Sequence, residues 1–320
     1  MYENLNKLEE KFKIHSFPLN IGIEPSNYCN FNCIMCTHNK ITRPKGFMDI
    51  RTYKKIIDEV ASTNPETRIY LDFYGEPLLS RYKLYYMIKY AKEAGIRNVN
   101  TNTNASILDE ELSEMILDSG IDYISMDCDG FSKEVYENIR VGGNRDAFYK
   151  NVEYILNRKK ELKLDKPIIE VKIIEMDENR HEVDQVMKYW QGKGAWTAKR
   201  RMHSWGGSND LSKLHDLDFR IACGKAIGIC AITWEGNVVN CPSDVDGSHI
   251  WGNVNEKSIK EIWKKRNEFL TKLHLEHRFS ELPKICQTCN DWQIVGEERF
   301  DDKGQPVQKN YNEEGKTFVK

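Results

Sequence analysis

The 320-residue chain has no long apolar segment and no excess of charge of one sign. No apolar run reaches the roughly 20 residues of a membrane-spanning helix, so a membrane protein is not expected. The formal net charge is −2, with 47 Lys and Arg against 49 Asp and Glu, and this balance indicates neither a nucleic acid nor a membrane surface as partner. The N-terminal stretch MYENLNKLEEKFKIH lacks the apolar core of a secretory signal. These absences predict a cytoplasmic location.

Internal repeats are also absent, whereas cysteine is abundant. In a reducing compartment clustered cysteines indicate metal ligands rather than disulfides. Eight of the nine cysteines fall into two groups that are far apart in the sequence, and Cys128 stands alone between them.

Short apolar runs alternate with helical patterns from about residue 50 to 205, after a first predicted strand near residue 21. The predicted strands are Ile21–Pro25, Arg68–Tyr74, Asn98–Asn102, Tyr123–Asp127, Ile168–Ile174 and Thr197–Met202. The predicted helices are Arg51–Ser62, Ser80–Ala94, Asp109–Leu117, Lys133–Ile139, Arg145–Leu162 and Asn179–Gln191. Such alternation favours an α/β fold whose parallel strands end at one common face.

The pattern changes after this region. A polar linker is predicted over Ser204–Asp218, and a β-hairpin over Ile229–Cys241 that turns at Glu235-Gly236-Asn237. A helix over Ser258–Leu273 follows, and then a loop with two cysteines. We therefore expect a core domain over residues 1–205, a small second domain over 206–295 and a disordered tail over 296–320.

The first cysteine group is a C-x3-C-x2-C run, formed by Cys29, Cys33 and Cys36, directly after the first predicted strand. Three thiolates on one loop can bind three irons of a [4Fe–4S] cluster and leave the fourth iron open for chemistry. A structural zinc site, with His38 as fourth ligand, is the alternative, but zinc ligands usually come as two separated pairs.

This run and its position resemble the signature of the radical S-adenosylmethionine (SAM) superfamily. The resemblance implies a partial (β/α)6 barrel, in which SAM chelates the open iron and is cleaved by one electron to a 5′-deoxyadenosyl radical. An external one-electron donor such as flavodoxin or ferredoxin is implied as well. The same resemblance marks Gly75 and Glu76 as a G-E-P motif at the end of the second strand, with Glu76 accepting hydrogen bonds from the SAM ammonium group.

Three further SAM contacts are implied by resemblance. Asn104 follows the third strand, Ser125 lies on the fourth, and Arg140 offers a fork-shaped guanidinium to the SAM carboxylate. For Asn104 an ordinary Asn-rich turn is the alternative, and for Arg140 a solvated arginine at a helix end.

The second cysteine group consists of Cys223 and Cys241 at the predicted hairpin and of Cys286-x2-Cys289 further on. Four thiolates allow a zinc site or a second, fully ligated iron–sulfur cluster. Beside a radical SAM core, the spacing resembles the SPASM extension in its shortened "twitch" form, which implies one auxiliary [4Fe–4S] cluster bound by these four cysteines. A fully ligated cluster suits electron transfer.

This shortened form resembles that of butirosin-type aminocyclitol dehydrogenases, which oxidise a carbinol to a ketone. The resemblance favours a carbohydrate-like or small polar substrate. Arg201, His203 and Asp244 are candidates for the base or polarising group. Cys128, beside Asp127 at the expected barrel mouth, is interpreted first as a packing residue. The alternative is that Cys128 donates a hydrogen atom to a substrate radical, which would make the protein an epimerase. Maturation of a ribosomally made peptide and a non-catalytic zinc module are the alternatives.

Overall fold

The computed structural model describes residues 14–209, 220–293, 298–307, 310–311 and 317–318. Its main sheet has ten strands in the order β10-β6-β5-β4-β3-β2-β1-β7-β8-β9. The six predicted strands are parallel neighbours in chain order. They are β1 (Asn20–Ile23), β2 (Arg68–Leu71), β3 (Val99–Thr103), β4 (Tyr123–Asp127), β5 (Ile168–Glu175) and β6 (Trp196–Arg201). This arrangement confirms the predicted parallel α/β fold.

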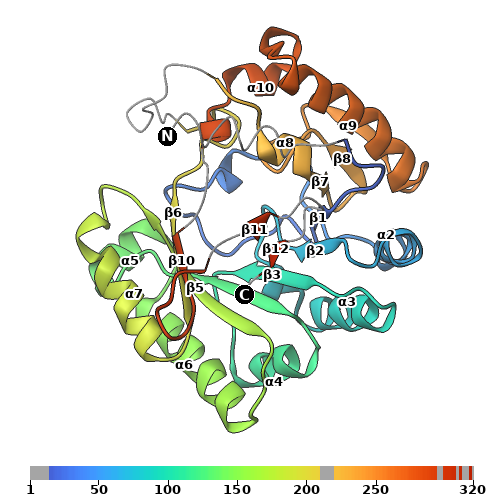
Figure 1. Ribbon diagram of the computed structural model, residues 1–320. Coiled ribbons are helices and arrows are strands. Elements are labelled where there is room, and N and C mark those ends of the chain that lie inside the picture. The colour runs from blue at the N-terminus through green and yellow to red at the C-terminus, as the bar shows by residue number, and fades with distance from the viewer. Residues whose placement is uncertain (1–13, 210–219, 294–297, 308–309, 312–316, 319–320) are drawn as a thin grey trace.

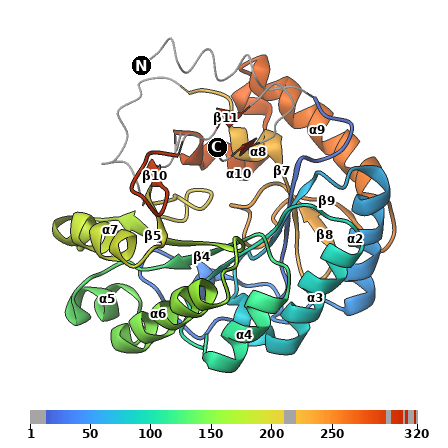
Figure 2. The same cartoon turned by 60° about the horizontal axis from the view of Figure 1, so that its bottom comes forward.

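Helices follow these strands and cover the outer face of the curved sheet (Figures 1 and 2). They are α2 (Ile50–Thr63), α3 (Arg81–Glu93), α4 (Glu110–Asp118), α5 (Lys133–Ile139), α6 (Arg145–Glu161) and α7 (Val183–Gly192). Several begin at side chains that accept the free N–H groups of the first turn, such as Asp49, Asp109 and Asn144. The predicted helix over 179–191 starts as a short 3₁₀ turn, Arg180–Glu182, and becomes α-helical only at Val183.

The two faces of the sheet differ in polarity. Apolar residues such as Ile69 and Ile124 point to the helices and form the main core. Because side chains alternate along a strand, Tyr123, Ser125 and Asp127 of β4 point to the opposite, inner side. That inner side is the lumen of the partial barrel, and it is lined with polar and charged groups.

The C-terminal part continues the same sheet. It contains α8 (Gly224–Gly228), β7 (Ile229–Ile232), β8 (Asn237–Val239), β9 (Ile250–Asn253), α9 (Ile259–Leu275) and α10 (Lys284–Thr288). Strands β7 and β8 are antiparallel, as the hairpin prediction requires, and Gly236 takes a φ of 88° at the turn. Strand β7 also pairs in parallel with β1, which sequence patterns did not predict.

The predicted disordered tail is partly ordered, and that prediction is wrong for residues 298–307. Strand β10 (Glu298–Phe300) pairs antiparallel with β6, and the Arg299 guanidinium lies 2.5 Å from the buried Glu170 carboxylate. This ion pair neutralises a buried carboxylate and so holds the charged segment against the sheet. Further on, two-residue strands β11 (Asn310–Tyr311) and β12 (Thr317–Phe318) pair with each other. Positions 210–218 of the predicted linker lie outside the described residues.

Within the described residues, none of the helices has both the length and the apolar character to span a bilayer.

Candidate functional site

The first cysteine loop follows β1 and alternates between inside and outside. Phe31, Cys33 and Met35 are buried, and the residues between them are exposed. The thiols of Cys29, Cys33 and Cys36 belong to one small cluster of side chains at the end of the barrel. Backbone N–H groups point at two of the sulfurs, from Phe31 to Cys29 at 3.5 Å and from His38 to Cys36 at 3.4 Å.

The environment of these thiols fits a bound cation. Burial, with a smaller contribution from neighbouring thiols, raises the pKa of Cys29 to about 11 and that of Cys33 to about 12. Burial raises the pKa of Cys36 as well. Without metal the three thiols therefore remain protonated, whereas coordinated iron would stabilise them as thiolates. The ring of His38 binds the backbone oxygen of Asn27 at 2.9 Å, so it gives the zinc alternative no support.

The G-E-P segment lies directly against the cysteine loop. A Cβ atom on Gly75 would come within 2.2 Å of the Ser26 oxygen and 2.6 Å of the Tyr28 oxygen, so only glycine fits. The next residue, Glu76, donates its N–H to the Tyr28 oxygen at 2.8 Å.

The Glu76 side chain is buried and held in place. Its carboxylate accepts hydrogen bonds from the Leu78 N–H at 3.0 Å, the Thr103 hydroxyl at 2.6 Å and the Asn104 N–H at 2.8 Å. Burial raises the pKa of Glu76 to about 7. A cation at this position, such as an ammonium group, would therefore stabilise its ionised form.

Two predicted SAM contacts already have protein partners. The Asn104 side chain donates to Asn30 at 3.0 Å and accepts from Ser106, so it connects the end of β3 to the cysteine loop. The Ser125 hydroxyl donates to Glu170 at 3.2 Å inside the lumen.

Arg140 is buried next to the cysteine loop. Its Nε donates to Asp129 at 2.6 Å, and its Nη1 lies 3.9 Å from the Cys33 sulfur. Its Nη2 is 3.5 Å from Asp127. The structure thus brings Arg140 to the cluster loop, where Asp129 occupies one edge of the guanidinium fork.

Sequence patterns did not identify a set of charged side chains in the lumen. Lys172 on β5 lies 3.0 Å from Asp127 and donates to Asn102, which in turn donates to Asp127 at 3.3 Å. Asp72 follows β2 and is half-buried, and within the described residues its carboxylate has no hydrogen-bonding partner. Burial raises the pKa of Asp72 to about 6, although the nearby Lys172 opposes this. Polar residues at every second position of β4 and β5 could have indicated this polar inner face from the sequence.

The candidate catalytic residues are scattered. Cys128 is fully buried in the helix-side core and contacts the Gly130 oxygen at 3.4 Å and the Tyr149 hydroxyl at 3.9 Å. The packing role expected for Cys128 is confirmed, and its expected place at the barrel mouth is wrong, because it points to the opposite face of the sheet from Asp127. Arg201 is exposed at the end of β6, and its neighbour Arg200 points inward instead.

Asp244 stabilises the loop after Cys241. Its carboxylate accepts four hydrogen bonds, from the Ser248 N–H and hydroxyl and from the N–H groups of Asn240 and His249. These bonds leave it little capacity to act as a base, and the predicted catalytic role is not supported.

His203 belongs to a buried network beside the second cysteine group. Its Nδ1 lies 2.8 Å from Lys225 Nζ and 3.9 Å from Asp291. Asp291 also accepts from Ser204 and Ser243 at 2.9 and 2.5 Å. Although burial opposes it, the charge of Lys225 lowers the pKa of Asp291 to about 2.

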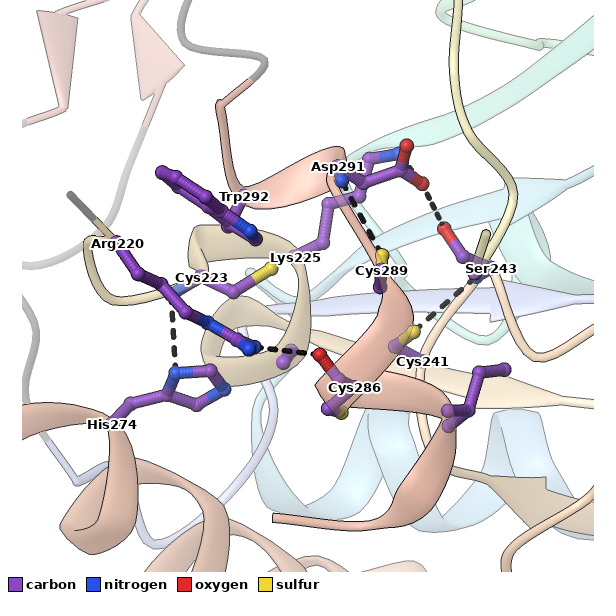
Figure 3. A pocket seen from close by; sticks show the side chains of 13 residues that line it. Arg220, Cys223, Lys225, Cys241, Ser243, His274, Cys286, Cys289, Asp291 and Trp292 are labelled. Atoms are coloured by element: carbon purple, nitrogen blue, oxygen red, sulfur yellow. Dashed lines mark hydrogen bonds and ion pairs between the residues drawn. The ribbon is translucent and has the colours of Figure 1, made fainter. Parts of the chain in front are cut away.

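The second group of cysteines converges from three segments of the chain. Cys223, Cys241, Cys286 and Cys289 line one cavity, shown in Figure 3. Three of the sulfurs face donors: Asn240 Nδ2 is 3.0 Å from Cys286, the Asp291 N–H is 3.3 Å from Cys289, and the Ser243 N–H is 3.4 Å from Cys241. The fifth cysteine of this region, Cys230, packs in the main core as a small apolar residue.

Basic groups complete the cavity. Arg220, Lys225 and His274 line it, and Arg266 lies buried behind it. Within the described residues, no three His, Cys, Asp or Glu side chains are placed to bind a single metal ion. Four thiols around a wider space, with positive charge and N–H donors beside them, fit a multi-iron cluster.

Comparisons with known proteins agree with this geometry. The family model of the radical SAM superfamily matches residues 23–188, and a model described as an iron-sulfur cluster-binding domain, SPASM, matches residues 223–290. Among curated proteins, the chain is 24% identical over 305 residues to a tungsten-containing aldehyde ferredoxin oxidoreductase cofactor-modifying protein of Pyrococcus furiosus, covering 79% of this chain and 84% of that protein.

A second curated relative is the S-adenosyl-L-methionine-dependent 2-deoxy-scyllo-inosamine dehydrogenase of Niallia circulans. The two are 22% identical over 284 residues, which cover 88% of this chain and 96% of that enzyme. The crystal structure of BtrN in complex with AdoMet and 2-DOIA superposes with a TM-score of 0.59 at 20% identity, covering 87% and 94% of the two chains. Streptococcus suis SuiB, bound to the precursor peptide SuiA, reaches 0.67 at 14% identity, covering 92% and 74%.

The geometry and the comparisons lead to the same assignment. The geometry consists of the two cysteine groups and of the G-E-P segment beside the first group, and the comparisons consist of the two family models. The chain belongs to the radical SAM superfamily and carries a SPASM domain, so it uses SAM with one SAM-binding [4Fe–4S] cluster and an auxiliary iron–sulfur cluster.

Proposed function

We propose that the chain is a radical SAM dehydrogenase that oxidises a carbinol of a small polar, carbohydrate-like substrate to a ketone. The observation that carries this proposal is the convergence of Cys223, Cys241, Cys286 and Cys289 around one cavity. Four thiolate ligands leave no iron open, and a closed cluster suits electron transfer. An alcohol oxidation needs such an acceptor, because it must remove a second electron after the hydrogen atom.

In this proposal Cys29, Cys33 and Cys36 would hold the first cluster, and SAM bound there would supply the radical chemistry that removes a hydrogen atom from the substrate. Glu76 would bind the ammonium group of SAM, and the Asn104 N–H, 2.8 Å from its Oε2 atom, holds this carboxylate in place. Arg140 holds the cysteine loop against the barrel.

The lumen binds the substrate. Lys172 and Asn102 hold Asp127 in place, while the Asp72 carboxylate retains its capacity to accept a hydrogen bond. We infer that Asp72 accepts the hydroxyl proton of the substrate, since a base with a pKa near 6 suits proton transfer at neutral pH. Loss of one hydrogen atom, one proton and one electron converts the carbinol into the ketone, so the reaction balances.

The curated dehydrogenase supports this choice, because the similarity spans 88% of this chain and 96% of that enzyme. Epimerisation is less favoured, because Cys128, its candidate hydrogen-atom donor, points to the helix side of the sheet and not into the lumen. A peptide substrate is the second candidate, favoured by the overlap of 92% of this chain with peptide-bound SuiB.

The test is an anaerobic incubation in deuterated buffer with SAM, reduced flavodoxin and 2-deoxy-scyllo-inosamine, next to a panel of other aminocyclitols and sugars. We expect one or more of these compounds to give a ketone without solvent deuterium at carbon. Deuterium at an inverted carbon would establish epimerisation instead. Cleavage of SAM with no change in any polyol, together with a modified precursor peptide, would overturn the proposal.

A further inference from the structure

His274 is a buried histidine whose role the proposed reaction does not explain. It lies on α9, is 0% exposed and lines the cavity of the four cysteines (Figure 3). Its Nδ1 accepts the backbone N–H of Cys223 at 3.4 Å. A nitrogen that accepts a hydrogen bond carries no proton, so this bond assigns the proton of the neutral ring to Nε2.

The Nε2–H group has no partner within the described residues. A buried donor without an acceptor costs about 1–3 kcal/mol. We therefore expect the cavity to hold a group that accepts a hydrogen bond from His274 Nε2–H. Four cysteine sulfurs line this cavity, and three of them already receive a hydrogen bond from Asn240, Ser243 or Asp291. His274 extends this set of donors on the Cys223 side.

We propose that the Nε2–H of His274 donates a hydrogen bond to a sulfur of the auxiliary cluster and raises its reduction potential. An N–H···S bond stabilises the extra negative charge of the reduced cluster, and hydrogen bonds to the sulfurs are a known determinant of cluster potential. His274 is thus a positioning and tuning residue. The cluster gains one electron and the ring neither gains nor loses a proton. Only the direction of electron flow rests on the proposed function.

The experiment uses the full chain with Cys29→Ala, Cys33→Ala and Cys36→Ala, so that only the auxiliary cluster contributes to the spectra. In this background His274→Gln keeps an N–H donor, His274→Met removes it at similar side-chain size, and His277→Asn changes an exposed histidine near the end of the same helix. Each protein is reconstituted anaerobically, its iron is counted and its cluster is titrated by potentiometry with electron paramagnetic resonance.

We expect His274→Met to lower the ratio of reduced to oxidised cluster about tenfold at a given potential, which is about 59 mV for one electron. The Gln variant and the His277→Asn control should stay close to the parent. In the parent, electron–nuclear double resonance should show an exchangeable proton that His274→Met lacks.

Equal potentials in the parent, the Gln and the Met proteins, each with about four irons, would overturn the inference. If the Met variant binds no cluster, the double-resonance spectrum of the parent protein still tests the inference. A parent with ¹⁵N-labelled histidine that shows no exchangeable proton on the labelled ring would refute the hydrogen bond. Failure to form a ketone would refute the dehydrogenase proposal but would not change these potentials.

Discussion

At the residue scale, Asp72 has the properties of a group kept for function rather than for stability. Its carboxylate is half-buried without a hydrogen bond in the described part of the chain, and burial raises its pKa from 3.8 to about 6. An acid whose pKa is raised on folding binds its proton more tightly in the folded state. It therefore destabilises the fold increasingly as the pH rises from about 4 to about 6.

Asp72→Asn should accordingly stabilise the folded protein at pH 7.5 by up to about 3 kcal/mol, since the pKa shift is about two units and each unit corresponds to 1.36 kcal/mol. Chemical denaturation of the reconstituted protein measures this. The exposed Asp165→Asn is the matched control and should leave the free energy of unfolding unchanged. A clear loss of stability in Asp72→Asn would show that the carboxylate has a structural partner.

The same residue predicts a pH dependence of product formation. Below about pH 6 Asp72 is protonated and cannot accept a proton, so the ketone yield per cleaved SAM should fall tenfold per pH unit below that value. In Asp72→Asn this yield should be about 100-fold lower than in the parent at pH 7.5 and should not change with pH, so the two proteins should converge as the pH falls below about 6. Ketone and 5′-deoxyadenosine, counted in the same samples, test it, and an unchanged ratio would exclude Asp72 as the base.

At the scale of elements, the close contact of two loops at the ends of β1 and β2 depends on one glycine. Gly75→Ala would place a methyl group 2.2 Å from the Ser26 backbone oxygen, and backbone cannot move away as a side chain can. We expect a loss of about 2–3 kcal/mol and a lower affinity for SAM.

The control for this prediction is Gly192→Ala at the end of α7, where no atom lies within 4 Å of the new Cβ. It should stabilise the helix by about 0.5–1 kcal/mol. Thermal unfolding and equilibrium binding of SAM measure both variants. Equal stability of the two would mean that the two loops are not held in contact.

A second element-scale prediction concerns β10. Arg299→Met leaves the carboxylate of Glu170, 0% exposed, without its guanidinium, so it should cost about 3 kcal/mol. The double variant with Glu170→Gln should recover most of that loss, because residue 170 is then neutral and needs no counter-ion. Urea denaturation of the two single variants and the double variant measures this coupling, and additive effects would contradict it.

At the scale of the whole molecule, the two cysteine groups should behave as independent metal sites. The anaerobically reconstituted chain should contain about eight irons. Removal of the first group, Cys29, Cys33 and Cys36, should leave about four irons and abolish formation of 5′-deoxyadenosine.

Removal of Cys286 and Cys289 should also leave about four irons, but SAM cleavage should persist without ketone formation. Iron analysis and product quantification distinguish the two variants. Loss of all iron in either variant would mean that the two clusters assemble together.

Local features of the sequence were sufficient to identify the cofactor chemistry and most of the fold. Three cysteines on one loop, and a glycine and a glutamate after the next strand, act over a few residues, so their spacing determines what they can bind. Apolar runs and helix caps act locally too, and β4 and α5 begin and end at the predicted residues.

Only the tertiary structure decided which side of the sheet each remaining residue faces and what it meets there. Cys128 and Asp127 are neighbours in the chain, yet alternation along β4 sends one to the helix-side core and the other to the lumen. Likewise Lys172 meets Asp127, and His274 meets Cys223, through contacts between segments far apart in the sequence. Such contacts follow from packing of the whole chain, and no local pattern encodes them.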